Sequence, residues 1–256
     1  MISQTVFSLN ITTIVLIQLI LYGELYAAPF FMAMVVCPRC GNTKCYGYYL
    51  YCSGTLIAPT VFLTASHCDL HTSTVYITFD EQFVEKQSPL YKGTFYLHPE
   101  FRSRQNDPHD IAVVILDQPI MGLTPAQLPT VGQFDHLKGK QTFTAVGYGG
   151  LEMLPAPGGH TNTYLDARYY AVSSLNATNP AWLRLSQNPA TGDGGACYGD
   201  SGGPNFWGAG TDETTVIAGI TITGDAVCRA TNVIYRLDTP SARDFLGNFV
   251  HLTSTE

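Results

Sequence analysis

The chain has 256 residues, enough for one domain or for one unit of two lobes. Apolar residues make up 45% of it and charged residues only 13%, with 24 glycines and 15 prolines, which is typical of a turn-rich all-β protein with a substantial core. The formal net charge is −7 and the few Lys and Arg are scattered, so we expect no binding to nucleic acid.

The first segment with a clear pattern is the apolar run 11–21. Its length fits the hydrophobic region of a signal peptide and is short for a membrane span. Tyr26-Ala27-Ala28 is a partial cleavage signal, although the positive charge expected near Met1 is missing. We therefore expect residues 1–28 to be a signal peptide or leader and residues 29–256 to form the folded domain. The alternative is that the run is a strand of that domain.

Three cysteines, Cys37, Cys40 and Cys45, lie close together in the next segment. The spacing resembles half of a zinc ribbon, but the sequence has no second Cys-x-x-Cys. We expect one local disulfide among the three, and one thiol that is either free or bonded to another chain.

Short apolar or alternating runs, separated by turn residues, predict strands along most of the chain. The runs are 55–57, 61–64, 74–79, 93–97, 111–116, 141–146, 167–172, 216–223 and 233–237. No alternation of strands with helices appears. From Ser241 onward apolar residues recur at helical spacing, and Thr239 followed by Pro240 is a helix start signal, so a helix is expected at that end.

Two surface features carry weaker expectations. Asn176-Ala177-Thr178 is a glycosylation sequon, which has meaning only in a eukaryotic secretory pathway. Asp80, Glu81 and Glu85 are a weak candidate for a calcium loop, but surface carboxylates are usually solvated. We expect no metal and no other cofactor.

The most informative stretch is Gly199-Asp200-Ser201-Gly202-Gly203-Pro204. Its glycines allow a sharp turn and bring backbone N–H groups close to a bound atom. A serine held in such a turn is a candidate nucleophile, with the N–H groups of Gly199 and Ser201 directed at an oxyanion. Because serine alone is a weak nucleophile, the chain must also supply a base and a group that orients the base.

A histidine and an acid lie at the ends of two apolar runs. His67 follows the run 60–63 through a tight turn, and Asp110 opens the run 111–116. A carboxylate at the mouth of a buried strand is costly unless it is paired, and an imidazole N–H is a suitable partner. Asp107 is the rival acid, but Asn106-Asp107-Pro108 is typical of a turn, so we prefer Asp110.

Four segments together resemble the chymotrypsin/trypsin family of serine proteases. They are Ser53-Gly54-Thr55-Leu56-Ile57, Thr64-Ala65-Ser66-His67-Cys68, Asp110-Ile111-Ala112 and Cys197-Tyr198-Gly199-Asp200-Ser201-Gly202-Gly203-Pro204. Their order and spacing fit the family, and the resemblance covers residues 29–250. It implies an all-β fold of two six-stranded antiparallel β-barrels with a crossover near residues 120–140, an active site in the cleft between the barrels, and a short C-terminal α-helix.

The resemblance also implies roles for single residues. His67 is the general base, Asp110 orients it, Ser201 attacks the scissile carbonyl, and Gly199 with Ser201 forms the oxyanion hole.

Two disulfides are implied as well. Cys52 pairs with Cys68 beside the histidine, and Cys197 pairs with Cys228 in the wall of the substrate pocket. Both require an oxidising compartment, so the protein is expected to be secreted.

The pocket that receives the side chain before the scissile bond is implied in the same way. Its residues are Gly195 at the base, Tyr198 at the rim, and Ile222, Thr223, Gly224 and Val233 in the walls. An acid at the base would select Lys or Arg, but this chain has glycine at that position. Val233 stands where a glycine leaves the pocket deep. We therefore expect a shallow, uncharged pocket for small or medium apolar side chains, although Asp225 nearby would attract a basic group.

The sequence departs from the family pattern at two positions that affect the carboxylates of the site. In many family members an ammonium group, freed by cleavage after a basic residue, pairs with the acid before the serine, here the structural acid Asp200. The first basic residue of this chain, Arg39, lies past the expected position of that terminus, so cleavage by signal peptidase is the expected source of the ammonium. Ile222 stands where the family often has a serine that bonds the catalytic acid, with Thr221, Thr223 or water as replacements.

The sequence thus predicts a secreted serine endopeptidase with a Ser-His-Asp triad and an acyl-enzyme intermediate. Its partners would be protein or peptide substrates and protein inhibitors, with no nucleic acid and no stable membrane span. The alternative is a non-catalytic homologue that acts as a binding module, but such proteins usually lose a triad residue and this chain keeps all three. An esterase of the α/β-hydrolase type fits poorly, because in such enzymes the serine precedes the histidine, whereas here His67 precedes Ser201.

Overall fold

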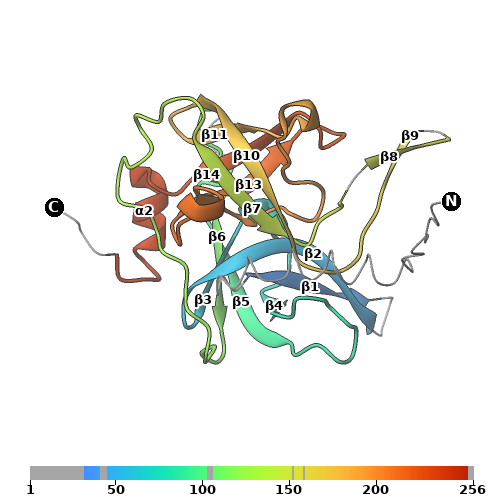
Figure 1. Cartoon of the computed structure of the whole chain (residues 1–256). Coiled ribbons are helices and arrows are strands. Elements are labelled where there is room, and N and C mark those ends of the chain that lie inside the picture. The colour runs from blue at the N-terminus through green and yellow to red at the C-terminus, as the bar shows by residue number, and fades with distance from the viewer. Residues whose placement is uncertain (1–31, 41–44, 103–105, 152, 158, 253–256) are drawn as a thin grey trace, which may run out of the picture.

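The structure, a computed structural model, describes residues 32–40, 45–102, 106–151, 153–157 and 159–252. The chain forms two closed antiparallel barrels of six strands each, a two-stranded hairpin and a short α-helix near its C-terminus (Figure 1). The predicted all-β fold with two six-stranded barrels is confirmed. The expected leader, residues 1–28, lies outside the described residues.

The first barrel occupies the lower half of Figure 1 and has the strand order β1-β2-β3-β6-β5-β4. Its strands are β1 (Met32–Cys40), β2 (Cys45–Ala58), β3 (Val61–Thr64), β4 (Thr74–Thr78), β5 (Tyr91–Leu97) and β6 (Ala112–Leu116). All four residues of β3 and four of the five in β6 are buried. These neighbouring strands are covered on both faces, which explains why they are continuously apolar in sequence.

The second barrel has the order β10-β11-β14-β13-β12-β7. Its strands are β7 (Thr142–Gly147), β10 (Tyr169–Thr178), β11 (Trp182–Ser186), β12 (Pro204–Trp207), β13 (Ile217–Gly224) and β14 (Thr231–Arg236). The hairpin consists of β8 (Met153–Ala156) and β9 (Gly159–Asn162). Sequence patterns missed β1, β8, β9, β11 and β12. For β12 the reason is its start at a proline after two glycines, which are turn residues by local propensity.

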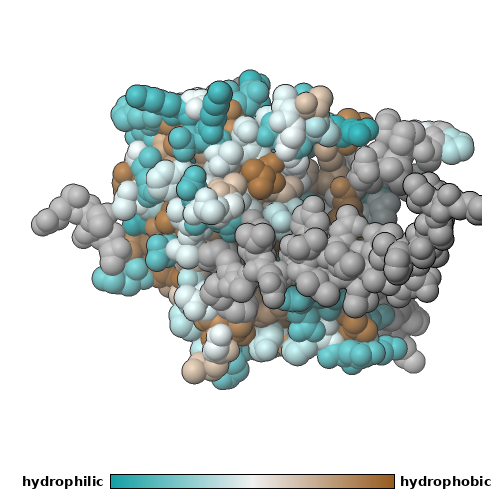
Figure 2. Space-filling model, in the orientation of Figure 1, coloured by the Kyte–Doolittle hydropathy of each residue, from teal (hydrophilic) through white to brown (hydrophobic). Residues whose placement is uncertain are grey.

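One apolar core holds the barrels and the helix together. It includes Leu56 and Phe62 of the first barrel, Phe206 and Ile220 of the second, and Phe245 of α2 (Pro240–Leu246). A smaller cluster fills the second barrel. In the view of Figure 2 the described surface is mostly hydrophilic, with apolar residues scattered over it. The shared core sets the position of one barrel against the other and so the geometry of any site between them.

The helix begins where the sequence predicted. Thr239 Oγ1 accepts a hydrogen bond from the N–H of Ala242 at 3.2 Å, and Pro240 occupies the first turn. The hydroxyl satisfies an N–H that has no partner within the helix, and proline costs nothing at that position.

A buried ion pair ties the connection between the barrels to β14. The guanidinium of Arg236 donates two hydrogen bonds to Asp238, at 2.9 and 2.7 Å, and both side chains are almost fully buried. Asp238 also accepts from the N–H of Phe134 at 2.7 Å, in the segment that links β6 to β7. Asp135 in that segment contacts the same guanidinium from a half-exposed position.

We predict that Asp238→Asn lowers the free energy of unfolding by about 3 kcal/mol or more, because it removes the buried one of the two carboxylates that pair with the Arg236 guanidinium. Asp135→Asn, the matched control, should cost under about 1 kcal/mol because that carboxylate is exposed to water. Urea unfolding of the two variants measures both values, and equal losses would contradict the proposed difference.

Candidate active site

The structure brings His67 and Asp110 into direct contact. Asp110 Oδ2 lies 2.7 Å from His67 Nδ1, and Asp110 Oδ1 accepts the backbone N–H of His67 at 2.9 Å. The carboxylate is mostly buried, whereas about a quarter of the imidazole is exposed (side-chain accessibilities 9% and 23%). A carboxylate at Nδ1 keeps the proton on that nitrogen, so the lone pair lies on Nε2 and faces outward as an acceptor.

Local structure explains this contact. His67 lies in a short 3₁₀ turn, Ser66–Cys68, directly after β3. Ser66 Oγ donates to the carbonyl of Ile111 at 2.6 Å, which fastens the turn to the residue that follows Asp110. Because β3 and β6 are paired neighbours in one sheet, the ends of both strands meet here. The two apolar runs of the sequence therefore place the imidazole and the carboxylate at the same edge.

The rival acid Asp107 and its neighbour His109 are directed elsewhere. Asp107 accepts the hydroxyl of Tyr235 at 3.0 Å. The buried ring of His109 lies 2.9 Å from Ser241 Oγ and stacks on His98 with ring centroids 4.6 Å apart. In the described contacts both Asp110 carboxylate bonds come from His67, and neither Thr221 nor Thr223 bonds to it.

The turn that carries Ser201 is fastened to the first barrel. The N–H of Ser53 donates to the carbonyl of Ser201 at 2.8 Å, and Cys68 Sγ lies 3.7 Å from the same oxygen. Gly199 and Gly202 have φ values of +99° and +77°, which side chains rarely adopt. A Cβ at Gly202 would also overlap Thr64 and the carbonyl of Ser53. The glycines are thus required by close approach as well as by backbone conformation.

His67 and Ser201 flank the same disulfide, Cys52–Cys68. No hydrogen bond joins their side chains among the contacts of the described residues. Such bonds are often long in a free enzyme and tighten when substrate binds. The second disulfide, Cys197–Cys228, is also present and anchors the chain just before the serine turn.

The N–H groups of Gly199 and Ser201 donate no hydrogen bond to any residue in the described part of the chain. Both residues are partly exposed. Unpaired N–H donors close to the attacking serine are what an oxyanion requires.

A cavity of about 320 Å³ opens beside Ser201. Of the residues expected in the substrate pocket, Tyr198, Ile222, Thr223 and Gly224 line it. Gly195 instead lines a neighbouring cavity, where a Cβ would overlap the side chain of Gln187. Val233, which was expected in the wall, pairs with Thr223 across β13 and β14 but is not among the residues that line the cavity.

The cavity also contains two polar residues, of which the sequence pointed to Asp225 but not to Asn232. Asp225, noted there as a neighbour, lines the cavity. Burial acts to raise its pKa, but N–H donors from Thr231, Arg229 and Ala230 outweigh burial and lower the pKa to about 2. Asn232, which sequence reasoning missed, is buried in β14 and donates to Asn205 Oδ1 at 3.0 Å. No local signal marks Asn232, because only the pairing of β13 with β14 brings it to the cavity.

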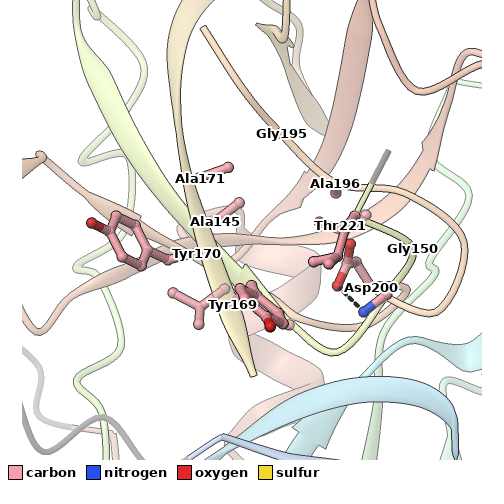
Figure 3. A pocket seen from close by; sticks show the side chains of 13 residues that line it. Ala145, Gly150, Tyr169, Tyr170, Ala171, Gly195, Ala196, Asp200 and Thr221 are labelled. Atoms are coloured by element: carbon pink, nitrogen blue, oxygen red, sulfur yellow. Dashed lines mark hydrogen bonds between the residues drawn. The ribbon is translucent and has the colours of Figure 1, made fainter. Parts of the chain in front are cut away.

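The carboxylate of Asp200 is enclosed on the other side of the serine turn. It accepts N–H groups from Gly149 and Cys197, each at 2.8 Å. Burial raises the pKa of Asp200 to about 6, and the two N–H bonds offset this only in part. A cavity of about 80 Å³ adjoins it, and Figure 3 shows the carboxylate near Thr221 and Gly150.

Two glycines that sequence reasoning missed make room for this carboxylate. A Cβ at Gly147 or at Gly149 would overlap the oxygen atoms of Asp200. The signal in the sequence was the run Gly147-Tyr148-Gly149-Gly150 directly after an apolar strand. Side chains cannot occupy these positions while the carboxylate stays buried.

The structure describes the candidate calcium loop but not the side chains of the cysteine cluster. The side chains of Cys37, Cys40 and Cys45 lie outside the described part of the structure. Glu81 pairs with Arg168 at 3.2 Å and Glu85 accepts the N–H of Tyr48 at 3.0 Å, so these two carboxylates have separate partners.

The described residues hold one cluster of potential metal ligands and no membrane-spanning helix. One group of ligand atoms lies close enough together for a metal, that of Cys52, His67 and Cys68, and its two sulfur atoms are bonded to each other. In the same part of the chain no helix has the length and apolarity needed to cross a membrane.

Comparison with known proteins agrees with this geometry. The family model described as Trypsin matches residues 37–245, so the chain belongs to the trypsin family of serine proteases. A similar protein is a venom serine protease from Polistes dominula, 28% identical over 195 residues. That match covers 67% of this chain and 66% of the relative, just under two thirds of its length.

The buried carboxylate yields a prediction about stability and pH. With a pKa of about 6 in the folded state against 3.8 in the unfolded state, Asp200 binds a proton more tightly when folded. Its contribution to the free energy of unfolding is therefore full below about pH 4 and is lost as pH rises through 6, a decrease of about 3 kcal/mol.

Urea unfolding between pH 4 and 7, with Asp200→Asn as the control, measures this contribution as the stability difference between parent and variant. The parent should lose stability relative to Asp200→Asn as pH rises, because only the parent ionises at this position. If the parent keeps or gains stability relative to the variant as pH rises, a cation pairs with Asp200.

Proposed function

We propose that this chain is a serine endopeptidase in which Ser201, His67 and Asp110 act as the catalytic triad. The observation that carries the proposal is the 2.7 Å contact between Asp110 and His67 at the disulfide that also contacts Ser201. Membership of the trypsin family supports it.

The mechanism follows from the positions of the protons. Ser201 Oγ attacks the scissile carbonyl while its proton passes to His67 Nε2, the nitrogen that Asp110 leaves unprotonated. The imidazolium formed is stabilised by the Asp110 carboxylate, and the oxyanion accepts the N–H groups of Gly199 and Ser201. His67 then protonates the leaving amine. Water hydrolyses the acyl-enzyme by the same steps in reverse.

The cavity beside Ser201 receives the side chain before the scissile bond and prefers small or medium apolar groups. Support comes from Ile222 and Thr223, two β-branched residues of β13 that line the cavity where glycine would leave more space. Asp225 is the opposing feature. Its carboxylate already accepts three backbone N–H groups and the amide of Gln187, which reduces what it offers to a ligand.

Secretion is part of the same proposal. Two disulfides in one domain require an oxidising compartment, and the similar protein is a venom component by its name. The partners would then be extracellular proteins or peptides, as substrates or as inhibitors, and one of Cys37, Cys40 and Cys45 would form any intermolecular disulfide. Asn176 in the sequon is exposed.

A fluorophosphonate probe tests the triad directly. The processed protein should be labelled, because such probes phosphonylate an activated serine. Ser201→Ala should not be labelled, and Asp110→Asn should react roughly 10³–10⁴-fold more slowly because its histidine takes the wrong tautomer.

Circular dichroism shows whether the variants are folded. No labelling of a folded, processed parent would reject the enzyme and favour the non-catalytic homologue, which keeps the fold for binding.

Peptides that differ only at the residue before the scissile bond test the pocket. Those with Ala, Val or Leu should be cleaved with a higher kcat/KM than the peptide with Arg. Thr223→Gly should raise kcat/KM for a Phe peptide by roughly tenfold, since it removes bulk from the wall. Fastest cleavage of the Arg peptide would show that Asp225 dominates and would overturn the apolar preference.

A further inference from the structure

A second cavity, of about 360 Å³, lies beside Gly199. It is lined by residues from both barrels, namely Tyr48, Tyr49, Leu50, Phe83, Glu85, Tyr148, Tyr164, Asp166 and Gly199. None of these residues contributes to the triad, and only Gly199 belongs to the site described above.

The position of this cavity relates it to the leaving group of the substrate. The first cavity contains Ser201 and the β13 wall, whereas the second contains Gly199 and the β2 segment 48–50. That segment leads within a few residues to Ser53, whose N–H binds the carbonyl of Ser201. A substrate with its acyl-side residue in the first cavity would continue past Gly199 toward the second. Because Gly199 lies two residues from Ser201, the residues just after the scissile bond are the ones that would reach the second cavity.

The lining has the chemistry of a cation site. It combines four tyrosines and one phenylalanine with two carboxylates, and none of its nine residues is Lys or Arg. Aromatic faces attract ammonium and guanidinium groups, and carboxylates add charge complementarity. The long apolar stems of Lys and Arg would also pack on the tyrosine rings.

The Glu85 carboxylate and the backbone of Asp166 are held by contacts across the cavity walls. Glu85 Oε1 accepts the backbone N–H of Tyr48 at 3.0 Å. The carbonyl of Asp166 accepts the N–H of Phe83 at 2.7 Å, which joins the two loops that carry the acids. The guanidinium of Arg168 pairs with Glu81 at 3.2 Å and also interacts with the side chain of Tyr148, one of the lining residues.

The wall next to Gly199 is anchored as well. The hydroxyl of Tyr148 donates to the carbonyl of Asp80 at 2.8 Å, and Gln82 and Ala167 form an isolated bridge between the same loops. The cavity is therefore formed before a ligand enters, which lowers the entropic cost of binding.

We propose that this cavity binds a Lys or Arg side chain from the leaving-group side of the substrate, so that the enzyme prefers a basic residue one or two positions after the scissile bond. The proposal rests on the proposed function, because the preference concerns the bond that Ser201 would cleave. The residues that determine it are Glu85 and Asp166, with the tyrosines as the apolar walls.

Internally quenched peptides test the preference. The residue before the scissile bond is kept constant, and the first or second residue after it is Lys, Arg, Leu or Glu. We expect Lys or Arg to give a kcat/KM roughly three- to tenfold above Leu, with Glu lowest. The advantage should shrink as salt is raised, because exposed charges are screened.

Two double variants separate a local effect from general charge. Glu85→Gln with Asp166→Asn should bring the ratio of Lys to Leu peptides close to one. The matched control, Asp117→Asn with Asp212→Asn, changes the net charge equally but lies outside the lining, and it should leave the ratio unchanged. A parent ratio near one, or equal losses in both variants, would overturn the proposal.

Direct binding separates failure of this inference from failure of the proposed function. The Ser201→Ala protein cannot cleave, and fluorescence anisotropy of the same Lys and Leu peptides, labelled with fluorescein, compares their Kd values. Tighter binding of the Lys peptide, lost in Glu85→Gln with Asp166→Asn, would support the cation site even if the parent cleaved no peptide. Equal binding of the two peptides would reject the site whatever the activity.

Discussion

The hydrogen bonds of Ser53 are the interactions on which the rest of the site depends. This buried residue of the first barrel uses its N–H for the carbonyl of Ser201, at 2.8 Å, and its hydroxyl for the carbonyl of Gly199, at 2.9 Å. The same hydroxyl accepts the N–H of Tyr148 at 3.2 Å, and its carbonyl accepts Thr64 Oγ1 at 2.9 Å. One polar residue thus joins the serine turn to both barrels, and a buried group so fully bonded resists displacement.

The enclosed carboxylate of Asp200 places a second demand on the same turn. Glycines at 147 and 149 are needed to admit it, and its two N–H bonds hold the backbone at Cys197 and Gly149. Burial of an ionisable group with only two N–H donors is unfavourable for the charged form, which is why its pKa is raised to about 6. The serine turn is therefore sensitive to whatever charge lies next to Asp200.

Gly199 lies between the chemistry and the two cavities that would select a substrate. One cavity is walled by β13 and β14 and holds β-branched side chains, and the other is walled by loops of both barrels and holds tyrosines and carboxylates. Their different linings mean that the two sides of a scissile bond would be recognised by different physical interactions, apolar packing on one side and cation–aromatic attraction on the other. Both depend on the same shared core, which sets the barrels against each other.

The sequence by itself determined the fold class, the helix start at Thr239 and the pairing of His67 with Asp110, because these follow from local patterns and from short motifs at strand ends. Strand β3 was predicted with its observed bounds, since a run buried on both faces is continuously apolar. Only the tertiary structure decided that Gly195 lies against Gln187, that Asn232 reaches the first cavity, and that loops from both barrels form the second. Contacts between residues distant in sequence arise from strand pairing and barrel packing, and periodicity along one segment carries no information about the partner.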